Sequence, residues 1–208
     1  YYIDHMAALG YVKDVDWIEE LITVPTDEKT IQRWEKLSDF VLKRNHLHIV
    51  SPRSRLGYLP LLKPFFDLVN VAYAPLYGTV DLTEQQIRKY SAKFAPLINP
   101  NTTCFVMDRD GRMIAFGVGA PSLANALQKH RGRLFPTGWV DVLKAFRRND
   151  TVDLLLIAVH PDYQARGVNA VILSKAMKGC LKMGIKQAET GPMLELNEKV
   201  QSQWKDFQ

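Results

Sequence analysis

The stretch TVDLLLIAVHPDYQARGVNAVILSKAMKGCLKMG, residues 151–184, decides the fold. It opens with an apolar run, residues 152–159, that is too apolar for a solvent-facing strand. It closes with residues 167–183, whose apolar side chains recur at helical spacing. Between the two runs lies the polar segment HPDYQARGVNA, residues 160–170. The sequence therefore predicts a buried strand that turns tightly into a helix.

A turn of this kind can bind phosphate. The first N–H groups of a helix have no partner within the helix, and the helix dipole places partial positive charge there. Gly167 permits a close approach to the backbone, and Arg166 offers a charge-assisted contact. The segment fits neither a Walker A loop nor a G-x-G-x-x-G loop. Taken alone, it is equally consistent with a glycine that only shapes the turn.

The order Val-His-Pro-Asp-Tyr-Gln-Ala-Arg-Gly-Val resembles the acetyl-coenzyme A loop of the GNAT superfamily of N-acetyltransferases. Its recurring form is V-x-P-x-x-[QR]-x-x-G-x-[GA], in which backbone amides hold the coenzyme pyrophosphate. The matching positions are Val159, Pro161, Gln164 and Gly167. Asn169 stands where Gly or Ala is usual, and Ala170 follows it. Asparagine tolerates unusual backbone angles, so this departure leaves pyrophosphate binding open.

The order of the expected elements strengthens the resemblance. The elements are a hairpin at 103–120, the strand 152–159, the helix after Gly167, a strand at 186–189 and a last helix near Asn197. This is the order of a GNAT core from its second strand onward, and the resemblance covers about residues 45–208. It implies an α/β fold with a GNAT-like mixed, mostly antiparallel sheet, flanked by helices and with splayed central strands.

The hairpin is the clearest local signal. Two apolar runs are joined by DRDG, which places Gly111 at a positive φ. Asp108 and Asp110 resemble the start of a calcium loop only superficially, because no Glu closes it. We therefore interpret the turn as structural.

Four helices and two strands are expected upstream of the hairpin. They are a short helix at 3–9, a strand at 11–24, a helix at 27–45, a strand at 47–50, a helix after Pro60 and a helix from Thr83 to about Ala95. Thr83 with Gln86 three residues later is a capping-box pattern. We interpret residues 1–24 as the tail of a preceding GNAT-like unit. Residues 25–208 then form a GNAT-like acyltransferase domain with a helical insertion at about 122–149. Both ends of the chain read as cut, with the C-terminal strand truncated.

The composition is that of an ordinary globular protein. Of 208 residues, 47% are hydrophobic, and the formal net charge is +5. This mild basic excess is compatible with an anionic partner, either nucleic acid or a phosphorylated small molecule. No apolar run is long enough to span a membrane, and Cys104 and Cys180 lack the spacing of a zinc site. The sequence favours a cytoplasmic protein with two reduced core thiols, no membrane partner and no metal.

The resemblance also implies where acetyl-CoA binds. The strands 152–159 and 186–189 splay apart, and the pantetheine arm lies between them, bonded to the backbone near Ile157 and Val159. Acetyl-CoA is the acyl donor, and a backbone amide at the splay polarises its thioester carbonyl. The residues expected to bind the coenzyme are Ile157, Ala158, Val159, Gln164, Ala165, Arg166, Gly167, Val168, Asn169, Ala170 and Asn197.

Direct attack by an amine requires a general base and an acid for the departing thiolate. Glu189, at the end of its strand, is the candidate base, with His160, Tyr163 and Glu195 as weaker alternatives. Many GNAT enzymes use a tyrosine of the last helix as the acid, within N-x-x-A-x-x-x-Y. Here Asn197 begins that pattern and Trp204 stands at the tyrosine position. An indole cannot donate a proton of suitable pKa.

Two classes of function therefore stay open. The first is an acyl-CoA-dependent N-acetyltransferase acting on a small-molecule or peptide amine. The second is a GNAT-like coenzyme-binding or scaffolding module without efficient catalysis. Nucleic-acid binding through the basic insertion at 122–149 is a third and weaker reading. We expect the acceptor side to be built from the helices at 60–95 together with that insertion.

Overall fold

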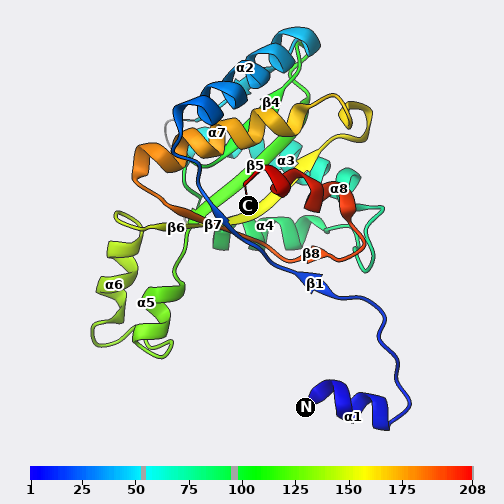
Figure 1. Cartoon of the computed structure of the whole chain (residues 1–208), viewed down its shortest axis with the longest axis vertical. Coiled ribbons are helices and arrows are strands. Elements are labelled where there is room, and N and C mark those ends of the chain that lie inside the picture. Colours follow the sequence, from blue (N-terminus) through cyan, green and yellow to red (C-terminus); the bar gives the residue numbers. More distant parts are fainter. Residues whose placement is uncertain (53–54, 95–97, 208) are drawn as a thin grey trace.

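Figure 1 shows the computed structural model, which describes residues 1–52, 55–94 and 98–207. Its centre is a six-stranded sheet in the order β2-β7-β6-β5-β4-β3. The strands are β2 (Leu21–Thr23), β3 (His48–Val50), β4 (Cys104–Met107), β5 (Met113–Pro121), β6 (Thr151–Val159) and β7 (Gln187–Thr190). All neighbouring strands are antiparallel except β6 and β7, which are parallel. The predicted mixed, mostly antiparallel sheet is confirmed.

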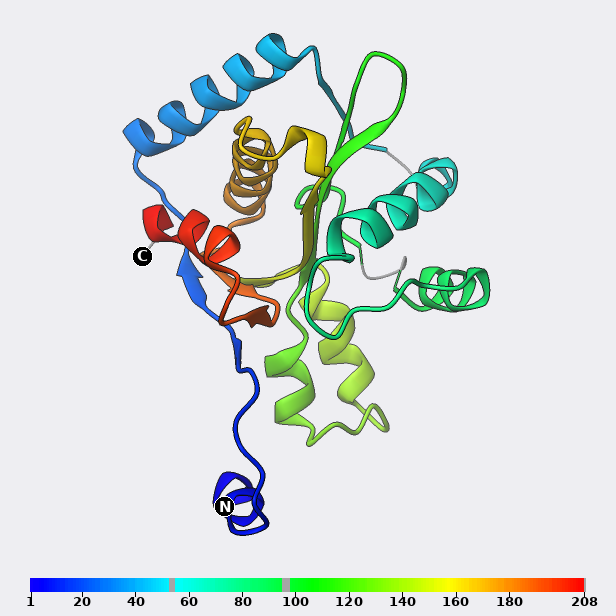
Figure 2. The same ribbon diagram turned by 90° about the vertical axis from the view of Figure 1, so that its right-hand side faces the viewer.

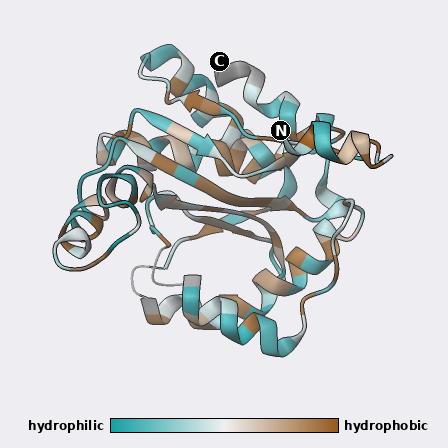
Figure 3. Cartoon of the chain, turned by 90° about the horizontal axis from the view of Figure 1, so that it is seen from below, coloured by the Kyte–Doolittle hydropathy of each residue, from teal (hydrophilic) through white to brown (hydrophobic). Residues whose placement is uncertain are grey.

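Helices cover both faces of the sheet (Figure 2). One face carries α2 (Glu28–Asn45) and α7 (Val168–Met183), and the other carries α3 (Leu59–Tyr73) and α4 (Glu84–Phe94). Hydrophobic colouring runs along the strands between these layers (Figure 3). Val152 and Met177 belong to the core on the α7 side, and Phe116 to the core on the α3 side. The sheet therefore has a hydrophobic core on each face, as the apolar run of β6 predicted.

The ends of the helices follow from local sequence. Asp27 caps α2 by accepting a hydrogen bond from the Thr30 N–H at 2.8 Å. Pro60 lies in the first turn of α3, where a missing N–H costs nothing. Thr83 and Gln86 form the predicted capping box before α4, while Ala95 lies outside the described residues.

The β4–β5 turn is the predicted hairpin. Gly111 has φ +78°, and the Asp108 Oδ1 atom accepts hydrogen bonds from the N–H groups of Asp110 and Arg112. The Asp108 carboxylate is thus engaged in shaping the turn. In the described parts of the chain no cluster of three or more His, Cys, Asp or Glu residues could hold a metal ion.

The two ends of the chain differ from the expectation. Instead of one strand at 11–24, the structure has β1 (Trp17–Ile18) and β2, which join different sheets. β1 pairs with an unexpected short strand, β8 (Met193–Leu194). The last helix is only α8 (Glu198–Gln201), followed by a 3-10 helix at Ser202–Phe207. The pairing of β1 with β8 joins residues about 175 positions apart, so local periodicity could not reveal it.

The N-terminal helix, α1 (Tyr2–Ala8), matches the predicted short helix, and Gly10 after it has φ +86°. Every residue of α1 is exposed. The strand β2 lies further in and extends the sheet by pairing with β7. Residues 21–23 therefore form an edge strand of the six-stranded sheet.

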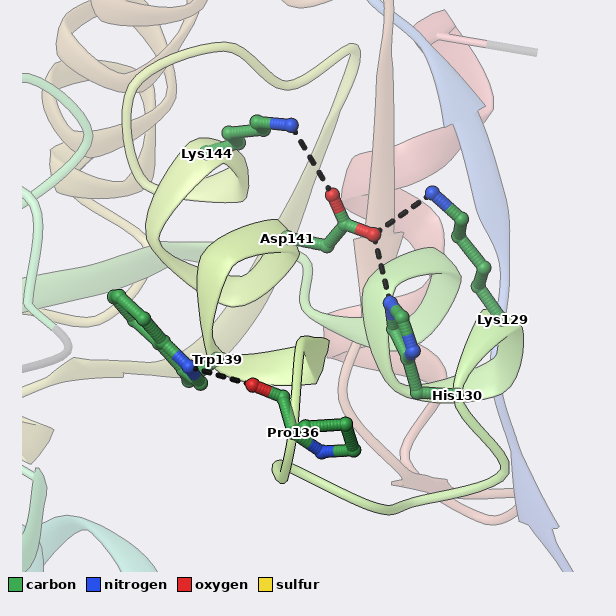
Figure 4. Close-up of polar contacts among 6 residues, drawn as sticks. All are labelled: Lys129, His130, Pro136, Trp139, Asp141 and Lys144. Atoms are coloured by element: carbon green, nitrogen blue, oxygen red, sulfur yellow. Dashed lines mark hydrogen bonds and ion pairs between the residues drawn. The ribbon is translucent and has the colours of Figure 1, made fainter.

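The insertion forms a small helical unit of its own. It contains α5 (Ala124–Lys129) and α6 (Gly138–Ala145), and the break between them includes Pro136. The Asp141 carboxylate accepts hydrogen bonds from Lys129 Nζ at 2.8 Å, His130 Nε2 at 2.7 Å and Lys144 Nζ at 3.5 Å (Figure 4). These partners, Lys129 first, hold the pKa of the Asp141 carboxyl well below its ordinary value. Part of the basic charge is therefore neutralised within the insertion itself.

One close approach ties α7 to the loop before β4. A Cβ atom added at Gly179 would lie 2.0 Å from the Asn101 carbonyl oxygen, a backbone atom. In an exposed helix, Gly→Ala usually stabilises. Here we expect Gly179→Ala to lower the free energy of unfolding by roughly 1–3 kcal/mol, because the helix must move away from that backbone.

Chemical denaturation measures this change. Lys182→Ala, at an exposed position of the same helix, is the control and should stay within about 0.5 kcal/mol of the wild type. An unchanged or higher stability of Gly179→Ala would contradict the close packing.

Candidate active site

The parallel strands β6 and β7 separate partway along their length. Thr151 to Leu154 of β6 pair with Gln187 to Thr190 of β7, and the Gly191 N–H donates to the Leu154 carbonyl at 3.0 Å. Pairing ends there, whereas β6 continues to Val159. The predicted splay of the central strands is thus present, and it begins after Leu154.

A β-bulge at Leu155 coincides with the start of the splay. Val118 of β5 faces Leu156, but Gly119 faces Leu154, so Leu155 is left without a partner. A bulge of one residue reverses which backbone groups face which neighbouring strand. After it, the His160 N–H points to β5 and donates to the Ile114 carbonyl at 2.8 Å. By alternation, the N–H and C=O groups of Ile157 and Val159 face the opening.

The contacts of these carbonyls confirm that direction. The Ile157 oxygen accepts a hydrogen bond from the Tyr73 hydroxyl at 3.0 Å, and the Val159 oxygen accepts one from Gln164 Nε2 at 3.5 Å. Ala158 differs from its neighbours, because its backbone faces Phe116 of β5. Of the three strand residues expected to bind coenzyme, Ile157 and Val159 therefore present backbone groups to the opening.

The loop after β6 leads directly to the N-terminus of α7. Ala165 has φ +59° and Gly167 has φ +79°, so two left-handed residues shape the turn. Gly167 is the N-cap of the 16-residue helix, and in the described part of the chain no side chain caps it. The first N–H groups of α7, at Val168 and Asn169, are therefore available to an anion at the end of the opening.

Arg166 of the loop and Asn169 of the first helical turn each contact another side chain. The Arg166 guanidinium carbon lies 4.9 Å from the centre of the Tyr163 ring. Asn169 occupies an ordinary helical position, and its Nδ2 donates to Gln203 Oε1 at 3.3 Å. The departure from the motif at Asn169 thus connects α7 to the C-terminal 3-10 helix and leaves its backbone N–H in the first turn.

The residues of the last helix have structural contacts. Asn197 caps α8 by accepting a hydrogen bond from the Val200 N–H at 3.4 Å. Trp204 is buried in the core between α7 and the sheet, and its Nε1 lies 3.2 Å from the Met193 sulfur. Trp204 therefore fills the core at the position where the resemblance places an acid.

Two acidic residues lie side by side on neighbouring strands next to the splay. Asp153 of β6 is the register partner of Glu189 of β7, and both are partly buried. Val152 and Ala188 point into the core under α7, so alternation places Asp153 and Glu189 on the face covered by α3 and α4. Among the described residues the Asp153 Oδ1 atom is buried without a hydrogen-bond partner. The sequence reasoning missed Asp153, although a lone acid in an apolar strand was a usable signal.

The weaker base candidates are engaged elsewhere. His160 is buried, and its Nδ1 accepts a hydrogen bond from the Asp162 N–H. The Glu195 carboxylate accepts hydrogen bonds from Lys13 Nζ at 2.9 Å and from the Asp16 N–H at 3.0 Å. Both side chains therefore have partners away from the splay, unlike the Asp153 Oδ1 atom among the described residues.

A large apolar cavity adjoins the bulge on the same face. Its volume is about 880 Å³, and it lies between α3, α4 and the strands β5 and β6. Leu155 and Leu156 both line it, because the bulge turns two successive side chains to one face. We expected the insertion to contribute to the acceptor side. As far as the described residues go, it lines no part of this cavity, and it joins β6 at the end away from the loop.

The splay, the loop and the helix N-terminus together define a class of protein. Residues 64–201 match the acetyltransferase (GNAT) family, which is most of the chain. This chain belongs to the GNAT family, whose acyl donor is acetyl-CoA. Within the described residues no helix is long and apolar enough to cross a membrane.

The chain is also similar to individual proteins. The chain is 25% identical to Protein YghO of Escherichia coli K12, over 83% of this chain and 43% of that protein. It shares its fold with a GCN5-related N-acetyltransferase of Sphaerobacter thermophilus (TM-score 0.58, 11% identity, 94% of this chain and 48% of that one). It also resembles a tandem GNAT protein of the clavulanic acid pathway (TM-score 0.53, 10% identity, 96% and 51%). The chain thus spans about half the length of these proteins.

Gly167 offers a direct test of the predicted loop. A Cβ atom there would lie 3.1 Å from Val41 Cγ2, and it would disfavour the left-handed φ of +79° that the turn requires. We expect Gly167→Ala to weaken acetyl-CoA binding by about tenfold or more, because the amides from 164 to 170 would shift. Calorimetric titration measures the affinity.

Gly184 is the matched control. It ends the same helix with φ +72°, and a Cβ atom there would meet nothing within 4 Å. Gly184→Ala carries a similar backbone strain but should keep the wild-type affinity. Equal losses in both variants would show that strain, not the loop geometry, weakens binding.

Proposed function

We propose that this protein is an acyl-CoA-dependent N-acyltransferase that transfers acetyl from acetyl-CoA to a primary amine by direct attack. One observation carries the proposal. The splay between β6 and β7 presents the backbone of Ile157 and Val159 and leads to the uncapped start of α7. A polar strand edge continuous with an anion site matches a ligand that has amides at one end and phosphates at the other.

The residues present fit acetyl-CoA in two places. The amides of residues 164–170 would hold the pyrophosphate, with Gly167 allowing close approach. The backbone of Ile157 and Val159 would bond the pantetheine amides. When bound, the coenzyme supplies an activated acyl group. An N–H group at the splay would stabilise negative charge on the carbonyl oxygen under attack.

The acceptor nitrogen must lose a proton, and two carboxylates are placed to take it. Glu189 is the base inferred from sequence, and the structure adds Asp153 beside it on the cavity side of the sheet. A carboxylate in this position can accept the proton directly or through one water. We propose that the Asp153–Glu189 pair acts as the base.

Tyr73 brings a phenol hydroxyl to the splay. Its hydroxyl bonds the Ile157 carbonyl, and burial raises the pKa of Tyr73 to about 12. A phenol with so high a pKa keeps its proton at neutral pH and serves as a hydrogen-bond donor. We assign Tyr73 a positioning role, because it fixes the strand edge at Ile157.

A binding module without efficient catalysis is the second candidate, favoured by the burial of Trp204 where the family's acid is usual. Calorimetry with acetyl-CoA and thiol release with a panel of primary amines separate the two. Binding with thiol release supports the enzyme, and binding without release across the panel supports the module. A folded full-length protein that binds no acetyl-CoA would contradict both.

We expect Asp153→Asn and Glu189→Gln each to lower kcat at pH 7, with the larger loss, about 10²-fold or more, at the residue that takes the proton. The loss should shrink as pH rises, because more of the amine is then neutral before it binds. Thiol release from pH 6 to 10 measures the profile. Glu19→Gln, at an exposed carboxylate, is the control. A loss that is constant across this range would argue against the pair as base.

A further inference from the structure

We propose that the cavity between α3, α4 and the sheet binds a hydrocarbon chain attached to one of the two reacting groups. The inference rests on the proposed acyltransferase function and names its substrate class. It predicts that the preferred substrate pair carries a long alkyl chain, either on the acyl-CoA or on the amine.

The wall of the cavity is built almost entirely from apolar side chains. The aliphatic and aromatic lining residues are Tyr58, Leu61, Leu62, Phe65, Phe66, Val69, Tyr73, Ala74, Val80, Leu82, Tyr90, Ile98, Phe105, Val118, Leu155 and Leu156. Phe65 is central, with its ring centre 4.4 Å from that of Phe116 and 6.3 Å from that of Phe105. A ligand bound against such a wall is stabilised mainly because its apolar surface is removed from water.

Two polar side chains of the wall are engaged within the protein, while the Ser91 Oγ atom, among the described residues, is buried without a hydrogen-bond partner. Asn70 Oδ1 accepts from the Leu82 N–H, and the Thr79 hydroxyl bonds the carbonyls of Tyr73 and Leu76. Among the described lining residues Asp81 is the one carboxylate, and it is exposed. A chain with several charged amino groups would find no matching partners there, whereas a hydrocarbon chain needs none.

The position of the cavity connects it to the reacting centre. Leu155 and Leu156 line it at the bulge, and they are 39% and 38% exposed. Tyr73 also lines it and reaches the Ile157 carbonyl in the splay. A chain whose reactive end lies at the bulge would extend into the cavity and cover both leucines. The volume of about 880 Å³ is within the range of sites that enclose drug-sized ligands.

The chain can belong to either reactant, and both sources share the same chemistry. An acyl chain would enter from the thioester carbonyl, and an alkyl chain would enter from the attacking nitrogen. The two cases differ in which substrate shows a dependence on chain length. The experiment therefore varies one chain at a time.

In the full-length protein, one arm measures kcat/KM for straight-chain acyl-CoAs of two to twelve carbons with a small amine. The other arm uses acetyl-CoA with straight-chain alkylamines of two to twelve carbons. One arm should show a rise of about fourfold per methylene until the cavity is full, because each buried methylene adds its transfer free energy. The arm that rises identifies the source of the chain.

Variants locate the effect in the cavity. Val69→Phe adds bulk at a lining position of α3, and Ala74→Phe does so at an exposed lining position where misfolding is less of a concern. Val71→Phe, on the same helix and 45% exposed, is the matched control outside the lining. We expect the first two variants to lower the rate with long chains by about tenfold or more, while acetyl-CoA binding is kept. Val71→Phe should behave as the wild type.

The outcomes separate this proposal from the one it rests on. Acetyl-CoA binding and turnover with a flat chain-length profile in both arms would overturn the hydrocarbon site and leave the acyltransferase intact. A rising profile that Val69→Phe and Ala74→Phe leave unchanged would also overturn it. If acetyl-CoA binds without turnover, calorimetry of dodecanoyl-CoA and dodecylamine replaces the rates, and no gain over the two-carbon compounds counts against the site. Failure to bind any acyl-CoA overturns the acyltransferase itself.

Discussion

The bulge at Leu155 in β6 is the constraint on which the rest of the site depends. A regular strand would keep the same set of backbone groups directed at β7 along its whole length. One extra residue reverses the alternation where pairing with β7 ends, so the Leu154 carbonyl still bonds β7 and the backbone of Ile157 and Val159 faces the opening. The same extra residue turns Leu155 and Leu156 to one face. A single irregularity thus creates both a polar edge and the mouth of an apolar cavity.

The polar edge of β6 leads directly into the loop and the N-terminus of α7. β6 runs from the bulge to Val159, and the chain then turns through Ala165 and Gly167 into α7. Helix α7 is held firmly, since its buried face packs against the sheet and Gly179 approaches the backbone before β4. An anion site at its N-terminus is therefore supported by a large part of the core, which reduces the cost of ordering it on binding.

The sequence predicted the features that depend on neighbouring residues. The strand–turn–helix at 152–183, the DRDG hairpin and the capping box at Thr83 all follow from local pattern, and all are present. The bulge, the facing of Asp153 and Glu189, and the bond from Tyr73 to Ile157 depend on the register between distant segments. Local periodicity carries no information about such register, so these features needed the structure. The motif located the loop, but it could not show that Asn169 binds Gln203.

The burial of Trp204 is compatible with the proposed acyl transfer. A thiol has an ordinary pKa near 8.5, so a thiolate leaves readily at neutral pH without prior protonation, unlike an alkoxide or an amide nitrogen. What it requires in an apolar site is a hydrogen-bond donor that lowers the cost of the transient charge. Tyr73 has its hydroxyl at the splay and, with its pKa raised to about 12, keeps its proton throughout. Because this single proton is donated to the Ile157 carbonyl, we propose that a free backbone N–H group at the splay supplies the hydrogen bond, and the apolar cavity beside it would make that bond stronger than it is in water.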